Sequence, residues 1–370
     1  MKAVAERGAL LKSLGHVQSV VERRNTIPIL SNLLLRAEDG RLSLAATDLD
    51  MEATEALDAK IESAGSVTAP AQTLYDIVRK LPEGSEVALT HNAEESRLTV
   101  SAGRSRFALA TLPASDFPTL SAPDDAKQFE MTAAELRRLF EKARFAISTE
   151  ETRYYLNGVY LHEMTDEGLL RAVATDGHRL ARIDMPVPAG AEGMPGIIVP
   201  RKMVSELVKM LDDDEQLVQI TVSETKIRVV ADRIVLTSKV IDGQFPDYTR
   251  VLPSGNDKFL TADAAMFAGA VDRVATVSSE KSRAVKLALE EDKLVLSVNA
   301  PDSGSADEEL LVGYAAEPLT IGFNAKYLLE IVGQIDRENA IFEFADAGAP
   351  TLVREDGDES AVYVVMPMRV

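Results

Sequence analysis

Three related copies of one pattern follow each other along the chain, and this repetition constrains the fold more than any other feature. The triplet Ala46-Thr47-Asp48 recurs 128 residues later as Ala174-Thr175-Asp176. The segment at 70–81 has counterparts at 200–211 and 324–335. Each counterpart follows a short apolar strand and carries apolar residues at helical spacing. Because 370 residues are too many for one hydrophobic core, we interpret each copy as a domain.

A second amphipathic helix is predicted near the start of each copy, at 6–24, 132–147 and 261–277. Thr132 and Glu135 have the spacing of a capping box. Alternating apolar residues between the helices indicate antiparallel strands separated by turn formers. We therefore expect α+β domains, each with two helices packed on one face of about eight strands. Duplication of such a domain says nothing of function by itself. The predicted domains span residues 1–121, 128–252 and 258–370.

Positive charge is concentrated in the predicted helices. The six helical segments hold fifteen Lys and Arg against nine Asp and Glu, a net charge of +6. The remaining residues carry -25, which gives the total of -19. If the helices line one surface, that surface attracts phosphates without reading base sequence, while the remainder repels polyanions. The alternative to a phosphate-binding surface is that these Lys and Arg residues only solubilise the polar faces of amphipathic helices.

Several classes of function lack their sequence signals. The absence of cysteine excludes disulfides and thiolate chemistry and fits a reducing cytoplasm. No apolar run approaches a membrane span, and no signal-peptide core follows the N-terminus. Asp176 and His178 suggest a catalytic pair, but an aspartate repeated at a strand end is more typical of a turn. The acidic runs 212–215 and 307–309 lack the spacing of a calcium loop and are interpreted as solvated turns. No cofactor or metal is expected.

Taken in order, several segments make the chain resemble the bacterial DNA polymerase III beta subunit, the sliding clamp. The resemblance runs from Met1 to the last residue. It implies a head-to-tail homodimer whose six domains form a ring, with helices toward the hole and sheets outside. It also implies a non-catalytic processivity factor that encircles duplex DNA. The segments that carry the resemblance are 27–35 (IPILSNLLL), 47–49 (TDL), 81–84 (LPEG), 102–107 (AGRSRF), 153–158 (RYYLNG), 174–180 (ATDGHRL), 242–248 (DGQFPDY) and 363–370 (YVVMPMRV).

The resemblance further implies a hydrophobic pocket between the second and third domains that takes short linear peptides. We call this set of residues the partner pocket. Its methionines offer an adaptable apolar surface, and its arginines are expected at the rim. By position, the partner pocket consists of Leu156, Thr175, Gly177, His178, Arg179, Leu180, Pro246, Arg250, Val251, Val364, Val365, Met366, Pro367, Met368 and Arg369.

DNA-contacting residues are implied in the same way. The chain departs from the family pattern at Gln72 and Glu150, which puts DNA contacts there in doubt, and at Ser282 and Val370, which puts contacts in or beside the partner pocket in doubt. The predicted DNA-binding residues are Arg24, Arg137, Tyr154, Tyr155, Arg201 and Lys202.

The implied partners are double-stranded DNA of any sequence, a second copy of the chain, the replicative polymerase subunit, an ATP-dependent clamp loader, and repair and translesion polymerases. No membrane partner is expected. Two rival hypotheses remain at this point. One is a three-domain hydrolase or transferase that uses Asp176 and His178, and the other is a protein-binding scaffold without a role on DNA.

Overall fold

The computed structural model describes residues 1–22, 26–92, 94, 96–278, 283–301 and 303–369. Within these ranges, no helix is long and apolar enough to cross a membrane. The chain divides into two compact units, Met1–Arg137 with Pro188–Ile241, and Arg138–Val187 with Asp242–Val370. Each unit is described separately.

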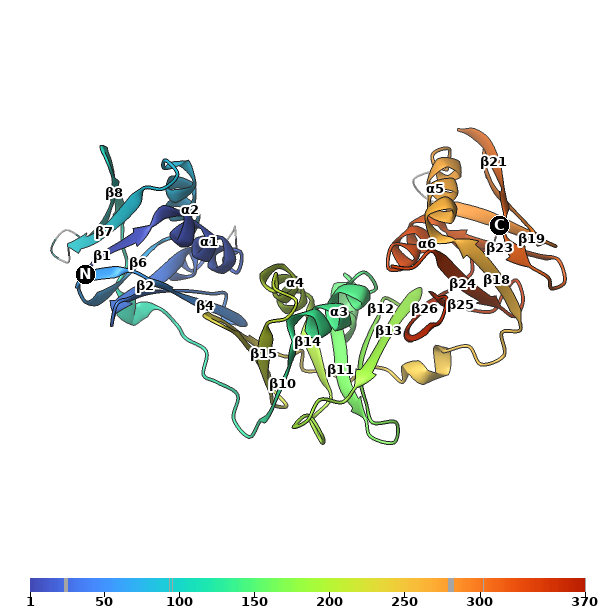
Figure 1. The fold of residues 1–370 in the computed structure, drawn as a ribbon, viewed down its shortest axis with the longest axis horizontal. Helices are drawn as coiled ribbons and strands as arrows, with labels where there is room; N and C mark the ends of the chain where they lie inside the picture. The colour runs from blue at the N-terminus through green and yellow to red at the C-terminus, as the bar shows by residue number, and fades with distance from the viewer. Residues whose placement is uncertain (23–25, 93, 95, 279–282, 302, 370) are drawn as a thin grey trace. The chain divides into compact units, whose positions relative to one another are not determined.

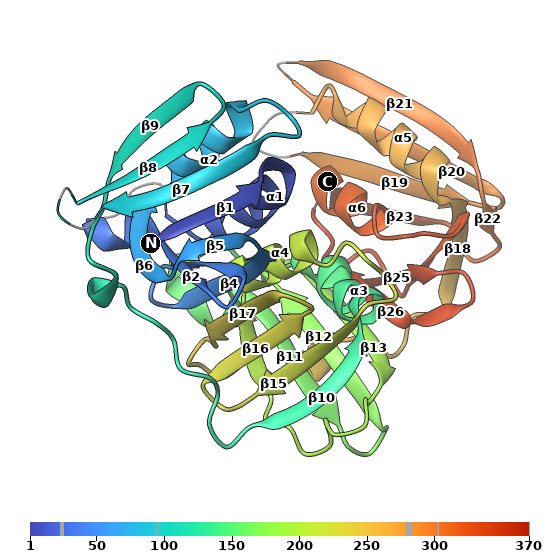
Figure 2. The same cartoon turned by 60° about the vertical axis from the view of Figure 1, so that its left-hand side comes forward.

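The first unit contains two antiparallel sheets (Figures 1 and 2). Its helices are α1 (Arg7–Gln18), α2 (Ala71–Lys80) and α4 (Arg201–Met210), and α3 (Ala133–Arg144) begins in this unit. The smaller sheet has the order β5 (Lys60–Ser63), β1 (Lys2–Glu6), β7 (Glu86–Asn92), β8 (Arg97–Ala102) and β9 (Ser105–Ala110). The larger sheet has the order β10 (Lys127–Thr132), β15 (Leu217–Val222), β16 (Lys226–Ala231), β17 (Ile234–Lys239), β4 (Met51–Asp58), β3 (Arg41–Thr47), β2 (Asn32–Glu38) and β6 (Gly65–Pro70).

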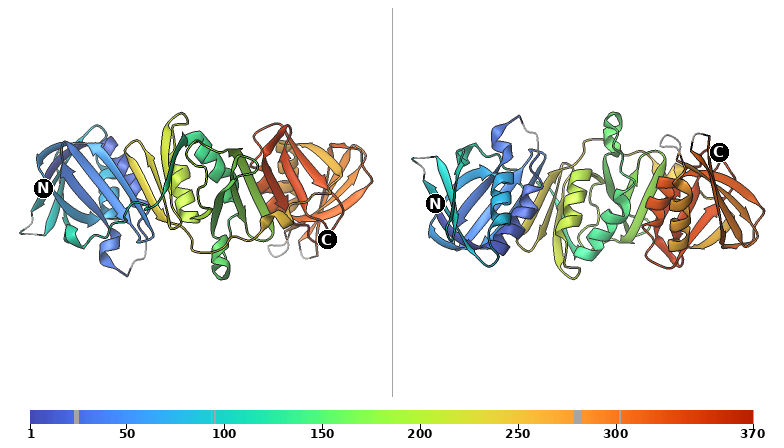
Figure 3. Two further views of the ribbon diagram at one scale, coloured as in Figure 1. Left: turned by 90° about the horizontal axis from the view of Figure 1, so that it is seen from below. Right: turned by 90° about the horizontal axis from the view of Figure 1, so that it is seen from above.

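The second unit repeats this plan with α5 (Ala264–Ala275) and α6 (Ala325–Val332), which pack side by side (Figure 3). One run of paired strands is β11 (Gly158–Met164), β12 (Leu169–Thr175), β13 (Arg179–Pro186), β26 (Asp358–Val365), β25 (Thr351–Glu355), β24 (Asn339–Phe344), β18 (Lys258–Asp263) and β22 (Gly313–Tyr314). The other is β21 (Gly304–Leu311), β20 (Lys293–Ala300), β19 (Ala284–Glu290) and β23 (Leu319–Asn324). The short strand β14 (Ile197–Pro200) belongs to the first unit and leads into α4.

Alternation along the strands puts one face of each sheet into the core. The strand β4, for example, buries every second residue, from Met51 to Leu57. The α+β class and the two α-helices per copy are confirmed among the described residues. The predicted capping box also forms, since the amide of Thr132 donates to Glu135 Oε2 (2.8 Å) and the amide of Glu135 donates to Thr132 Oγ1 (3.2 Å).

Two sequence expectations are wrong in detail. The helix predicted for 6–24 ends at Gln18. Beyond it the amides of Val20 and Val21 bond to carbonyls three residues earlier, which closes the helix in tight turns. The acidic run 307–309, interpreted as a turn, lies in β21, where its backbone pairs with β20. Side-chain charge does not prevent an edge strand from forming, because its outer residues remain in water.

Strands from successive copies join into common sheets. The last strand of the second copy, β17, pairs with β4 of the first, and Ser238 lies opposite Met51. The last strand of the third copy, β26, pairs with β13 of the second, and Val365 lies opposite Arg179. Both β4 and β13 are the third strands of three-stranded meanders. The two junctions are therefore built in the same way.

The repeated Ala-Thr-Asp triplet forms the same turn at both junctions. Asp48 Oδ1 accepts from the amides of residues 50 and 51, and Asp176 Oδ1 accepts from the amides of residues 178 and 179. The residue after each aspartate has a positive φ, +79° for Leu49 and +89° for Gly177. The aspartates are thus turn formers, as their repetition predicted.

We expect Gly177→Ala to lower the free energy of unfolding by about 1–2 kcal/mol, because a Cβ is strained at this φ. The added atom would also lie 2.8 Å from Arg153 Nη1. The matched control is Leu49→Ala, at the equivalent position, which already carries a Cβ and should lose less than half as much. Urea unfolding of the two variants gives the comparison, and equal losses would contradict the explanation.

Candidate functional site

Residues of the predicted partner pocket come together where β13 and β26 run antiparallel. Its tail residues follow β26 directly, and the amide of Met366 donates to the carbonyl of His178 (2.9 Å). Two residues on, the amide of Met368 donates to the carbonyl of Gly322 within β23 (2.7 Å). Backbone bonds thus fix the tail beside the turn that contains Gly177. Residues nearly two hundred positions apart in the sequence are brought together here.

The turn at Thr175–His178 is held by hydrogen bonds of its own side chains and backbone. The Thr175 hydroxyl donates to the carbonyl of Arg179 (2.7 Å), and the amide of Gly177 donates back to the Thr175 hydroxyl (3.1 Å). The carboxylate of Asp176 accepts from the amide of His178 and from the Arg179 guanidinium. An Asp–His catalytic pair needs the carboxylate on the imidazole, whereas here it is on the backbone and an arginine. This geometry is that of a turn and gives the hydrolase hypothesis no support.

Arg179 was expected at the pocket rim, but it is buried. Its guanidinium pairs with Glu330 of α6 and with Asp176 (3.1 Å), and it donates to the carbonyl of Phe145 (2.7 Å). Its side chain is only 7% exposed, which leaves no room for a polar peptide end. The predicted rim position of Arg179 is wrong because one sequence does not show which carboxylates the fold brings to this side chain.

Two aromatic side chains that the sequence did not single out complete this part of the site. The Arg179 guanidinium lies 4.4 Å from the ring centre of Tyr327 and 5.1 Å from that of Phe145. The Tyr327 ring also stacks on His178, with centroids 6.2 Å apart. Burial raises the pKa of Tyr327, so it remains a neutral aromatic surface. A single aromatic residue among the twelve of segment 324–335 was the available signal.

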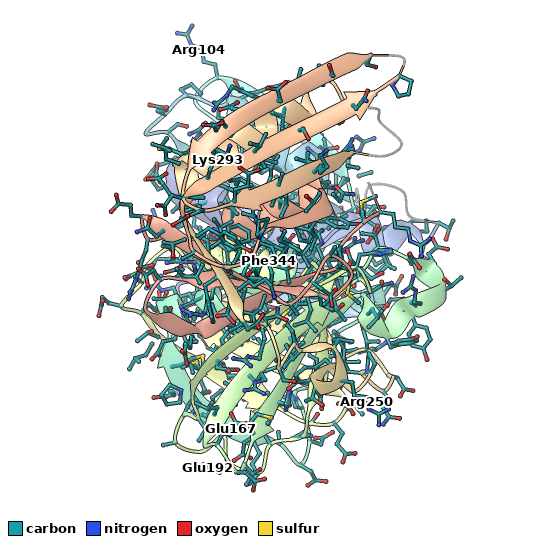
Figure 4. All side chains as sticks on the ribbon, turned by 90° about the vertical axis from the view of Figure 1, so that its right-hand side faces the viewer. Arg104, Glu167, Glu192, Arg250, Lys293 and Phe344 are labelled. Carbon is teal, nitrogen blue, oxygen red and sulfur yellow. The ribbon has the colours of Figure 1, made fainter. Side chains whose placement is uncertain are left out.

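A third segment, the linker (residues 242–257, before β18), carries Pro246 and, on its one-turn 3-10 helix η4 (Tyr248–Val251), Arg250 and Val251. All three are exposed, and Arg250 projects from the surface (Figure 4). Arg250 Nε pairs with Asp247 at the start of η4 (2.8 Å). This Arg250 therefore fits the predicted rim.

A fourth segment, the 3-10 helix η3 (Glu151–Leu156), packs against both the linker and the turn. At its middle, Arg153 lies against Gly177. Further along, Tyr155 Cβ lies against Gly243 at the start of the linker. The side chain of Leu156, at its end, is buried.

The predicted pocket residues therefore divide into two groups. One group is exposed or half-buried and can meet a ligand, and the other is buried and supports it. Apolar atoms are available on Val251, 40% exposed, and on Met366, 36% exposed. The outward group is Thr175, Gly177, His178, Pro246, Arg250, Val251, Met366, Pro367, Met368 and Arg369. The buried group is Leu156, Arg179, Leu180, Val364 and Val365.

The predicted DNA-binding residues differ in how free their side chains are. Tyr154 is 53% exposed, and Arg201 is exposed at the start of α4. Tyr155 is half-buried and meets the Tyr154 ring edge to face. Arg137 is engaged, since it donates to the carbonyl of Leu211 (2.5 Å) and pairs with Asp214.

Lys202 is likewise engaged inside the first unit. Its ammonium donates to the carbonyl of Val20 (2.8 Å) and to the carboxylates of Glu22 (2.9 Å) and Asp48 (2.5 Å). Burial works to lower the pKa of Lys202, but hydrogen bonds from its ammonium to Asp48 and Glu22 raise that pKa above its usual value. Lys202 is thus a charged side chain that holds these three parts of the first unit together.

Among the positions where the chain departs from the family pattern, Gln72 donates to Asp76 (3.0 Å) and Glu150 accepts from Arg153 (2.8 Å). The predicted DNA contact Arg24 lies outside the described residues, as do Ser282 and Val370. Within the described part of the chain, no group of three or more His, Cys, Asp or Glu could hold a metal ion.

Three family-level sequence profiles match this chain in order. They are those of the N-terminal, central and C-terminal domains of the DNA polymerase III beta subunit, at residues 1–121, 130–247 and 249–369. The beta sliding clamp of Caulobacter vibrioides is 55% identical over 372 residues, and that of Escherichia coli K12 is 41% identical over 374. Each match covers 100% of both chains.

Solved structures agree with the profiles. The sliding clamp of Bartonella birtlesii bound to griselimycin is 50% identical, with a TM-score of 0.97 over 100% of both chains. The Caulobacter crescentus beta sliding clamp with bound PEG is 55% identical, with a TM-score of 0.96 over 100% of this chain and 99% of the other.

These matches confirm the predicted resemblance and the expectation of a non-catalytic processivity subunit, and they remove the hydrolase and scaffold hypotheses. The chain belongs to the DNA polymerase III beta subunit family, the bacterial beta sliding clamps, and its function is that of a DNA sliding clamp.

Proposed function

We propose that two copies of this chain close head to tail into a ring of six domains around duplex DNA, with the domains bounded as predicted, 1–121, 128–252 and 258–370. The supporting observation is a junction that the chain leaves open. In the second and third copies, the last strand pairs with the third meander strand of the copy before it. The first copy ends in β9, and the third copy has β21 as its third meander strand.

Both strands are sheet edges in the described part of the chain, since β9 pairs with β8 and β21 with β20. An edge strand leaves a row of backbone donors and acceptors available to another chain. By analogy with the two internal junctions, β9 of one copy would pair with β21 of the next. A head-to-tail contact of this kind forms either a closed ring or an open filament, and the family resemblance favours a ring of two copies.

Charge and apolar exposure complement each other on the two edges. Arg106 lies in β9, and Arg104 projects from the turn before it (Figure 4). The edge β21 carries Asp307 and Glu309. Each edge also exposes a large apolar side chain, Phe107 (37%) and Leu311 (86%). Opposite charges steer the two edges together, and apolar contact stabilises the pairing.

Charge reversal on one edge tests this closure. Arg104→Glu with Arg106→Glu should weaken self-association by at least about a hundredfold, because like charges then face each other. Sedimentation should show the 40.1 kDa monomer instead of twice that mass. A second variant, Asp307→Lys with Glu309→Lys, should also be monomeric. An equimolar mixture of the two should recover the dimer, since one junction becomes wild-type and the other fully exchanged.

The control variant is Lys60→Glu, a charge reversal on the edge strand β5, which should remain a dimer. Wild-type protein should also stay bound to a closed circular duplex and leave it once the circle is cut. A monomeric wild type, or reversed variants that still sediment as dimers and stay on circles, would contradict the ring.

Contacts with DNA are proposed for the predicted set Arg24, Arg137, Tyr154, Tyr155, Arg201 and Lys202. Support is strongest for Tyr154 and Arg201, whose side chains are exposed. Arg137 and Lys202 would have to exchange a carboxylate of their own chain for a phosphate. Such contacts recognise phosphate and not base sequence, and salt weakens them, so a topologically linked ring is free to slide.

For the outward residues of the partner pocket, we propose binding of short linear peptides. The replicative polymerase subunit, an ATP-dependent clamp loader, and repair and translesion polymerases are the proposed sources of these peptides. The bacterial cytoplasm is the proposed compartment. Exposed Val251 and Met366 supply apolar area, and Arg250 supplies a charged rim.

Removal of residues 366–370 tests the pocket with griselimycin as the probe, because clamps of Bartonella birtlesii and Pseudomonas aeruginosa carry this ligand. In calorimetry, we expect the griselimycin affinity of the truncated chain to fall at least about tenfold, since loss of one central apolar contact costs about 2 kcal/mol. The dimer should persist in sedimentation. Unchanged griselimycin affinity would contradict the assignment.

A further inference from the structure

A cluster of buried polar and aromatic side chains lies under the linker that carries the rim of the partner pocket. Phe245 is 8% exposed and stacks on Tyr160, with centroids 5.0 Å apart and planes 10° from parallel. Tyr160 stacks in turn on His162 of the same strand, β11 (4.4 Å). Tyr248, the first residue of η4, is 6% exposed and also meets the His162 ring. The linker thus alternates buried anchors with the exposed pocket residues 246, 250 and 251.

The hydrogen bonds in this cluster have a defined direction. The carbonyl of Glu163 only accepts, so His162 Nδ1, 3.2 Å away, carries the proton. In a neutral imidazole, Nε2 is then an acceptor, and the Tyr248 hydroxyl 3.0 Å away donates to it. Arg171 Nη1 donates to the same hydroxyl oxygen (3.4 Å). The chain of donors therefore runs from Arg171 through Tyr248 to His162.

The first donor in this series of hydrogen bonds, Arg171, is held in one orientation. Arg171 is 5% exposed and forms a two-pronged bond to Asp184 through Nε (2.6 Å) and Nη2 (2.9 Å). Nη2 also donates to Glu167, which lies at the turn between β11 and β12 (3.2 Å; Figure 4). A buried guanidinium held by two carboxylates has a fixed plane, so its remaining nitrogen offers a fixed point for Tyr248.

We propose that Tyr248 is a positioning residue for the partner pocket, held between Arg171 and His162 so that η4 presents Arg250 and Val251 to the incoming peptide. This inference rests on the proposed peptide-binding function. It adds that affinity depends on side chains that do not touch the peptide. A preordered rim loses less conformational entropy on binding, which is why the anchoring hydroxyl matters.

Proton uptake by His162 would turn its Nε2 from a hydrogen-bond acceptor into a donor. A protonated ring donates at both nitrogens, so the Tyr248 hydroxyl would lose its imidazole acceptor and keep only the weak acceptor Met164 Sδ, 3.9 Å away. The groups that face His162 are the rings of Tyr160 and Tyr248, the guanidinium of Arg171, the carboxylate of Asp184 and the carbonyl of Glu163. Burial lowers the pKa of His162 below its usual value, and the charge of Arg171 adds to this effect, although the Glu163 carbonyl and the Asp184 carboxylate act in the opposite direction. His162 is therefore neutral at pH 7.5 and takes up a proton only in more acidic solution.

The decisive variant is Tyr248→Phe, measured in the full chain with griselimycin as the probe. Removal of the hydroxyl leaves a buried donor on Arg171 and an acceptor on His162 without a partner. We expect griselimycin affinity at pH 7.5 to fall about tenfold. The matched control is Tyr160→Phe, which keeps the stacked ring in the same cluster and should stay within about twofold of wild type. Both variants should sediment as wild type does.

A second measurement separates positioning from simple loss of packing. Wild type and His162→Gln are compared from pH 7.5 down to the lowest pH at which both proteins still sediment as they do at pH 7.5, because Gln accepts a hydrogen bond but does not titrate. Wild type should lose several-fold more affinity than His162→Gln on acidification. All other groups, His178 of the pocket included, are the same in both proteins, so their effects drop out of the comparison.

The outcomes distinguish this inference from the proposed function. If wild type does not bind griselimycin, or if the chain without residues 366–370 binds it equally well, the pocket assignment fails. If wild type binds and the truncated chain does not, the pocket stands. In that case, equal affinities of Tyr248→Phe and Tyr160→Phe, or pH profiles that coincide for wild type and His162→Gln, would overturn the positioning role.

Discussion

Antiparallel pairing between strands of successive repeats is the interaction on which the rest of this structure depends. At β4–β17 and at β13–β26, backbone hydrogen bonds run without interruption from one copy of the domain into the next. Such pairing satisfies the strand edges that would otherwise be exposed at each domain boundary. It also carries the tail after β26 to the turn after β12, which brings residues of the proposed partner pocket together. The edges β9 and β21 are what this pattern leaves open within a single chain.

The two junctions share a turn but differ in the cation that binds it. Asp48 Oδ2 holds the ammonium of Lys202, and Asp176 Oδ2 holds the guanidinium of Arg179. An ammonium is a compact charge that three oxygens surround, whereas a planar guanidinium also stacks on aromatic rings. At the second junction, this stacking involves Tyr327 and Phe145. Aromatic surface therefore gathers beside one copy of the repeated turn, the copy that adjoins the predicted pocket.

Local signals in the sequence were reliable where the physics is local. The capping box at Thr132, the turn at Asp176 and the helix at 200–211, observed as Arg201–Met210, depend on residues within four positions of each other. The helix predicted for 6–24 was too long, because amphipathic spacing does not show where tight turns close the last carbonyls. The acidic run 307–309 was misassigned because its strand exists only through pairing with β20.

By itself, the sequence determined the threefold repeat, the α+β class, the turn-forming role of Asp48 and Asp176, and the family resemblance. These follow from spacing and order, which a linear chain displays completely. Only the tertiary structure decided which predicted site residues face outward and which are already bound. Arg179 and Lys202 became internal ion pairs because folding brought distant carboxylates to them, and a buried charge must find such a partner. Tyr248 also depends on distant partners, since Arg171 and His162 lie on neighbouring strands far from it in sequence.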